Sequence, residues 1–322
     1  MKLLKMHGTN KDGDAVSLKR GDGSIMRRWV DVEAIFGPES EDPSYLHVVM
    51  AQCGLPYRDP KGLPFYKRSN GHAELAITPG LLWNPNTRQS ELQGIPYGPK
   101  ARLITLHLCT EAVLKRSPVI SVKESMSAFM QDMGIAVSGG KTGSIGGFKE
   151  QLNRLSAARV QFFLHNEEKV LMVNPAPMIH KHELWFPKNP KQQTLWPSEV
   201  TLSSEFYDAL IHHAVPLAPY AIRALQQSAM ALDVYFWLAH RLCRIPHYQV
   251  SRISWFALQR QLGSEYVDPY KFRQDFREAL AKVKVVYREA KVSFDSNGVL
   301  ELRQSKPPVE KIISGDKIKA FN

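Results

Sequence analysis

Apolar residues recur at helical spacing in a stretch near the middle of the chain. In SIGGFKEQLNRLS they lie three, four and three positions apart, so they form one stripe along a helix that we place at residues 142–158. The stripe consists of Ile145, Phe148, Leu152 and Leu155. The opposite face carries Gly146, Gly147 and polar side chains, and a strand predicted at 159–165 follows directly.

Further elements on both sides of this helix complete a recognisable order. Helical spacing predicts helices at 97–116 and 121–133, and the second begins at a Ser-x-x-Glu capping box, Ser121 to Glu124. Strands are predicted at 170–173 and 178–186. Three helices followed by a β-hairpin is the order of elements in a winged-helix domain.

The last third of the chain repeats this order. It is predicted to contain helices at 203–213, 219–239, 253–262 and 269–283, then strands at 285–294 and 299–303. Pro269 suits the first position of its helix. Asn297-Gly298 is a strong hairpin-turn signal between the two strands.

These patterns predict the α+β class, with two tandem winged-helix domains, each with helices followed by a β-hairpin wing. The expected parts are a mobile N-terminal arm at 1–24, an N-terminal winged-helix domain with an N-terminal extension at 25–190, a C-terminal winged-helix domain at 191–304 and a tail at 305–322. Residues 187–201, with three prolines and no periodicity, are predicted to form the linker. Within the extension, 72–78 alternate as a strand does and 82–96 are predicted to be a loop.

The net charge of the chain indicates which class of partner it binds. The 322 residues include 42 Lys and Arg against 31 Asp and Glu, a formal net charge of +11, which favours nucleic acid as the partner. No stretch approaches the roughly 18 apolar residues of a membrane span, and the N-terminus lacks the apolar run of a signal peptide. The three cysteines are far apart and predict neither disulfides nor a zinc site. We expect a soluble cytoplasmic protein.

The polar faces of two predicted helices carry side chains suited to double-stranded DNA. The first set is Lys141, Thr142, Ser144, Lys149, Asn153, Arg154 and Arg159. The second set is Tyr270, Lys271, Arg273, Gln274, Arg277, Lys282 and Lys284. Arg273 and Arg277 suit guanine and Gln274 suits adenine. The side chains that suit phosphates are Lys141, Lys149, Arg154, Arg159, Lys282 and Lys284. One such helix alone is more typical of an ordinary amphipathic helix with a solvated polar face, and the repetition of the unit favours DNA.

Two motifs suggest other chemistry. Gly134 to Thr142 resembles a phosphate-binding loop, but five residues separate Gly134 from Gly140 where the motif requires four. His180 and His182 lie on one face of a strand, as two ligands of a metal ion would, but no third ligand is evident. We expect no enzymatic activity, no cofactor and no metal.

Several segments resemble the RepA-type replication initiators of broad-host-range plasmids, over roughly residues 45–304. They are LPYRDP (55–60), YKRSNG (66–71), LAITPG (75–80), GIPYGPKARLITLHLCTEAV (94–113), SVKESMSAFMQDMGI (121–135) and GGKTGSIGGFKEQLNRLSAARV (139–160). The resemblance implies a non-enzymatic initiator that binds repeated origin sequences (iterons) and recruits the host initiator and replicative helicase. It also implies dimers that repress their own gene and monomers that start replication, and with them plasmid copy control. The alternative is a transcriptional repressor of the same fold.

Overall fold

The computed structural model describes residues 5–7, 16–19, 25–28, 42–84, 87–121, 126–140, 143–165, 170–182 and 199–309. Helices and antiparallel sheets share these residues, so the predicted α+β class is confirmed. The chain forms two compact units, which we call the N-terminal unit (Tyr45–Val215) and the C-terminal unit (Met1–Ser44 with Pro216–Gly315). The chain passes from one unit to the other after residue 44 and again after residue 215. The sequence predicted a domain boundary between residues 190 and 191.

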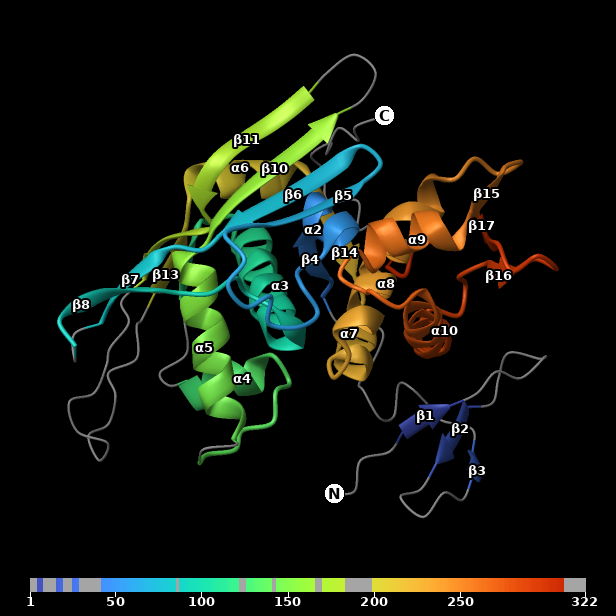
Figure 1. The fold of residues 1–322 in the computed structure, drawn as a ribbon, viewed down its shortest axis with the longest axis horizontal. Helices are drawn as coiled ribbons and strands as arrows, with labels where there is room; N and C mark the ends of the chain where they lie inside the picture. Colours follow the sequence, from blue (N-terminus) through green and yellow to red (C-terminus); the bar gives the residue numbers. More distant parts are fainter. Residues whose placement is uncertain are drawn as a thin grey trace. The chain divides into compact units, whose positions relative to one another are not determined.

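A four-stranded antiparallel sheet belongs to the N-terminal unit (Figure 1). Its order is β11-β10-β6-β5, from β5 (Tyr66–Asn70), β6 (Ala73–Thr78), β10 (Arg159–His165) and β11 (Val170–Pro177). Leu75 pairs with Phe162 and Ile77 with Val160, and all four side chains are buried on the core face. Both central strands agree with the sequence prediction. β11 runs through Pro175, which an edge strand tolerates.

A small hairpin stands where the sequence predicted a loop at 82–96. Its strands are β7 (Leu81–Asn84) and β8 (Gln89–Leu92). The side chains of Asn84 and Thr87 both donate to Glu91 Oε1 at 2.8 Å, which closes the turn. The loop prediction was wrong for these two strands and is confirmed for residues 93–96. The strands were missed because Leu81, Trp83 and Leu92 are exposed, so the segment lacks the alternation of a half-buried strand.

Four longer helices complete the N-terminal unit, with α2 (Val48–Cys53) beside them. They are α3 (Gly98–Lys115), α4 (Met126–Asp132), α5 (Ser144–Ala157) and α6 (Ser204–His212). A second sheet has the order β12-β13-β9, from β9 (Val119–Ser121), β12 (Ile179–His182) and β13 (Glu199–Leu202). Ser121 pairs with Glu199 in that sheet, whereas the sequence predicted a helix from residue 121; α4 is described from Met126, and residues 122–125 lie outside the described part of the chain.

The C-terminal unit is built from helices and a three-stranded sheet of order β15-β17-β16. The helices are α7 (Pro219–Leu225), α8 (Ala229–Arg241), α9 (Trp255–Leu262) and α10 (Pro269–Val286). The strands are β15 (Val250–Ile253), β16 (Val292–Phe294) and β17 (Leu300–Arg303). The short strands β4 (Ser44–His47) and β14 (Ala214–Leu217) each span a boundary between the units in the chain.

A separate antiparallel sheet of order β1-β2-β3 is formed near the N-terminus. Its strands are β1 (Lys5–His7), β2 (Val16–Lys19) and β3 (Ile25–Arg28). β1 and β2 fall within residues 1–24, for which the sequence analysis expected a mobile arm.

Two predicted elements of the C-terminal unit were too long. The helix expected at 219–239 is divided, because α7 ends at Leu225 and the Ser228 hydroxyl caps α8 by accepting from Ala231 N at 3.2 Å. The strand expected at 285–294 is reduced to β16, because α10 continues to Val286. Val286 is buried, so packing overrides the strand preference of this β-branched residue.

The N-terminal unit buries a neutral histidine at its centre. His47 is 1% exposed, its ring stacks on Phe162 with centroids 4.4 Å apart, and its Nδ1 accepts from Val49 N to cap α2. Burial, aided by His213, lowers the pKa of His47 to about 3. In the C-terminal unit, burial of His240 together with Arg244 and Arg241 lowers the pKa of that imidazole to about 3 as well.

Arg154 fastens α5 to the segment that leads into α3. Its guanidinium donates to both carboxylate oxygens of Asp59 at 3.0 and 3.1 Å and to Ile95 O at 3.0 Å. It also lies over the Tyr97 ring, 4.9 Å from the centroid. The Arg154 side chain is 12% exposed, so this bidentate pair is largely shielded from water.

We expect acid to destabilise the fold through His47 and His240, whose pKa values are both lowered. Each imidazole is neutral in the folded state and would protonate near pH 6.5 when unfolded, so the unfolded chain binds more protons below that value. Stability is intact above pH 6.5 and falls towards pH 3 by up to about 1.4 kcal/mol per pH unit for each group. Urea unfolding between pH 7.5 and 4.5 measures this slope. His47→Asn, which keeps a capping acceptor, should make the slope shallower, and an unchanged slope would contradict the assignment.

Arg154→Ala should lower the free energy of unfolding by about 1–3 kcal/mol, because Asp59 and the Ile95 carbonyl lose their donor. The matched control is Arg159→Ala, since that exposed side chain should change stability by less than about 0.5 kcal/mol. Equal stability of the two variants in urea would show that the Asp59 pair contributes nothing.

Candidate nucleic-acid interface

The buried stripe of α10 determines which of its side chains face water. Phe272, Phe276 and Val283 are fully buried, while Pro269 and the Asp268 cap, whose carboxylate accepts from Tyr270 N at 2.8 Å, fix the start of the helix. The side chains that remain exposed are Tyr270, Lys271, Arg273, Gln274, Arg277 and Lys284. Six of the seven residues predicted on this helix are therefore exposed, and the seventh, Lys282, is half-buried.

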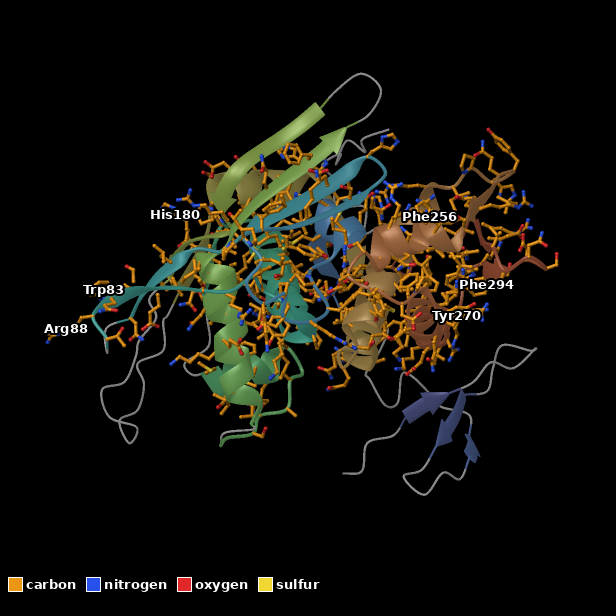
Figure 2. All side chains as sticks on the ribbon, in the orientation of Figure 1. Trp83, Arg88, His180, Phe256, Tyr270 and Phe294 are labelled. Carbon is orange, nitrogen blue, oxygen red and sulfur yellow. The ribbon has the colours of Figure 1, made fainter. Side chains whose placement is uncertain are left out.

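Two aromatic rings form a platform under this face, which we call the aromatic shelf: Trp255 and Phe294. Trp255 begins α9 and Phe294 ends β16, and their rings stack with centroids 5.2 Å apart and planes 15° apart. Trp255 also meets Phe276 edge to face at 5.8 Å and Phe272 at 6.3 Å. The shelf is thus continuous with the core that orients α10 (Figure 2 labels Phe294 and, nearby, Tyr270).

The two arginines of α10 both lie over the shelf. The guanidinium carbon of Arg273 is 5.6 Å from the Trp255 centroid and that of Arg277 is 5.2 Å from it. Arg277 also lies 5.3 Å from Phe294, and Arg273 lies 5.8 Å from Tyr270. Stacking uses the flat face of a guanidinium and leaves its N–H groups available for acceptors. Sequence reasoning did not find Trp255 or Phe294 as part of the site.

The lysines of α10 differ in how much charge they present. Lys271 pairs with Asp275 at 2.7 Å and Lys282 with Glu278 at 2.9 Å, both one helical turn apart. In the described part of the chain, Arg273, Arg277 and Lys284 form no such pair with a carboxylate. Positive charge is therefore concentrated on these three side chains.

The hairpin after α10 has the turn that the sequence predicted. Gly298 adopts φ +75°, and Asp295 Oδ1 accepts from Asn297 N at 2.9 Å and from Val299 N at 2.8 Å. On the strands, Glu301 lies between Arg252 and Arg303, with N–O distances of 2.9 and 3.3 Å. These two arginines are thus partly neutralised, unlike Arg273 and Arg277.

The set predicted around α5 is not brought together in the same way. Lys141 and Thr142 lie outside the described residues. The Ser144 hydroxyl is occupied within its own loop, since it donates to Ala136 O at 2.6 Å and accepts from Ser138 N at 2.9 Å. Lys149 and Asn153 are half-buried, and Arg159 is exposed at the start of β10.

Arg154, one residue of this set, stabilises the fold. The Arg154 guanidinium, expected to hold a phosphate, is occupied by Asp59, Ile95 and Glu150, the last at 2.7 Å. Lys100 approaches Gly147 closely and donates from its Nζ to Ser144 O. A Cβ atom added at Gly147 would lie 2.7 Å from that Nζ. The glycine-bearing side of α5 is therefore partly covered by the chain that precedes it.

The described histidines and cysteines do not form a metal-binding cluster. His180 is exposed on β12, and the side chain of His182 lies outside the described residues. Within the described ranges, three or more His, Cys, Asp or Glu residues nowhere gather as a metal would require. Burial raises the pKa of Cys53 and of Cys109 to about 12, so both thiols are protonated. No described helix has both the length and the apolar character needed to cross a bilayer.

Comparison with known proteins gives the family. A crystal structure of domain 2 and domain 3 of RctB superposes with a TM-score of 0.49 and 10% sequence identity, over 80% of this chain and 97% of that chain. No curated protein sequence matches. The family of plasmid-encoded RepA proteins matches residues 95–256, half of the sequence. The chain therefore belongs to the plasmid-encoded RepA protein family.

Proposed function

We propose that this protein is a plasmid replication initiator that binds repeated origin sequences (iterons) in double-stranded DNA. Membership of the RepA family supports the link to plasmid replication. One observation carries the DNA-binding role: two arginines stand side by side, stacked and unpaired by carboxylates in the described chain, on the exposed face of α10. A net charge of +11 agrees with a polyanionic partner.

We propose further that the C-terminal unit is a winged-helix domain. In support, the chain order is α8, β15, α9, α10, β16 and β17, and the sheet order is β15-β17-β16. Here α10 is the recognition helix and the β16–β17 hairpin is the wing. For the N-terminal unit the order α3, β9, α4, α5, β10, β11 supports the same assignment, although β10 also pairs with β6 and β9 pairs with β13.

In this mechanism α10 enters the major groove and its arginines donate to guanine O6 and N7. Gln274 reads adenine, and Tyr270 lies against the backbone. Phosphates are held by Lys271, Lys282 and Lys284, and by Lys149 and Arg159 of the N-terminal unit. Lys141, Thr142, Ser144 and Asn153 would add further contacts around α5.

Two linked DNA-binding domains would raise each other's effective concentration on one site. The proposal is non-enzymatic and needs no cofactor, so opening of the origin draws on binding energy, DNA bending and supercoiling. The host initiator and helicase are the proposed cytoplasmic partners, and a dimer of the protein represses its own gene.

A transcriptional repressor would use the same interface, and a maintenance assay separates the two. A plasmid that carries the protected DNA but lacks the gene should replicate only in cells that supply this protein. Operator binding without plasmid maintenance would favour the repressor.

Arg277→Ala should weaken binding to the selected DNA sequence by about 1–3 kcal/mol and relax the preference at one base pair, because a bidentate contact to guanine is lost. Arg58→Ala, which removes the same charge from an exposed position outside the interface, is the control. Fluorescence anisotropy with the site and its single-base variants measures both effects. A loss that is equal for every sequence would contradict base reading by Arg277.

Lys284→Ala should weaken binding to specific and random DNA by the same factor, because a phosphate contact carries no sequence information. The slope of log K against log salt should fall by about 1. An unchanged slope would remove Lys284 from the interface.

A further inference from the structure

We infer that the aromatic shelf sets DNA specificity by holding Arg273 and Arg277 in position to read two guanines. This rests on the proposed function and deepens it, because it assigns specificity to side chains that touch the reading arginines rather than the bases. Trp255 and Phe294 are positioning residues in this sense. The ligand is duplex DNA with two guanines within reach of one turn of α10.

The first step is the stacking geometry. Arg273 and Arg277 are four positions apart, one helical turn, and both guanidinium groups lie within 6 Å of the same indole ring. A free arginine side chain samples many rotamers and loses that freedom when it binds a base. Stacking on Trp255 restricts the rotamers before DNA arrives, which lowers the cost of forming a bidentate contact.

The second step is the rigidity of the shelf. Trp255 is held edge to face by Phe272 and Phe276, which are buried. Trp255 also stacks on the ring of Phe294 at the end of β16, next to the hairpin turn. The ring under the arginines is therefore fixed by the core on one side and by the hairpin on the other.

The third step is an asymmetry that makes the inference testable. Trp255 contacts both arginines. Of these two arginines, Phe294 contacts Arg277 and Tyr270 contacts Arg273. If positioning governs specificity, loss of each ring should affect the guanine read by its own arginine. A role in general stability would affect both guanines alike.

The experiment uses the full-length protein. Selection from random duplexes defines the preferred sequence, and Arg273→Ala and Arg277→Ala assign one guanine to each arginine. Each guanine is then replaced by 7-deazaguanine, which lacks the N7 acceptor, and the ratio of dissociation constants reports that contact.

Phe294→Leu should reduce the 7-deazaguanine ratio at the guanine of Arg277 by about tenfold. The ratio at the guanine of Arg273 should change less, because Phe294 reaches Arg273 only through Trp255. Tyr270→Leu should do the reverse. Tyr270 is 79% exposed, so this second variant tests the inference even if Phe294→Leu destabilises the unit. Phe256→Leu is the matched control, since this exposed ring on α9 stacks with Arg260 instead.

The outcomes separate two failures. If the parent protein selects no sequence, the proposed function fails and the inference falls with it. If the parent is selective but Phe294→Leu and Tyr270→Leu keep both ratios, or lower both ratios equally, only the positioning role is overturned.

Discussion

The packing of Phe272 and Phe276 against Trp255 is the interaction on which the proposed interface depends. Because Phe272 and Phe276 are buried, α10 has one orientation in its unit, and Arg273 and Arg277 emerge on the side where Trp255 meets Phe294. The same apolar contacts therefore stabilise the unit and determine which cations face solvent. Hydrophobic burial of this kind is non-directional, and the rigid ring geometry adds the direction.

The comparison of α5 with α10 shows why similar helices can differ in use. Both have an apolar stripe that is buried, and both are followed by strands. In α5 the arginine on the polar face pairs with Asp59, whereas in α10 the arginines stack on rings that leave their donors available. An arginine bound bidentately by a carboxylate would have to give up that pair to bind a phosphate. The C-terminal unit is therefore the stronger candidate for base reading, although the family match ends at residue 256, before α10 begins.

The sequence predicted those features that follow from periodicity and failed where distant residues decide. Local spacing predicted the apolar stripes of α5 and α10, the central strands β6 and β10, and the Asn297-Gly298 turn. Strands β9 and β15 are too short to show a period, and β7 and β8 expose their apolar residues. The Asp59 partner of Arg154 lies 95 positions away, and no local pattern indicates such a pairing. Trp255 and Phe294 were missed for the same reason, since their stacking appears only when α9 and β16 are brought together.

The central claim is that α10 reads DNA from the major groove, and protection of guanine N7 from methylation by dimethyl sulfate tests it most directly. The parent protein, saturating a DNA fragment selected for binding, should protect the N7 atoms of guanines at regular positions, one cluster in each bound repeat. If the complex forms fully and every guanine N7 is methylated as in free DNA, the arginines of α10 do not enter the major groove and the account is contradicted.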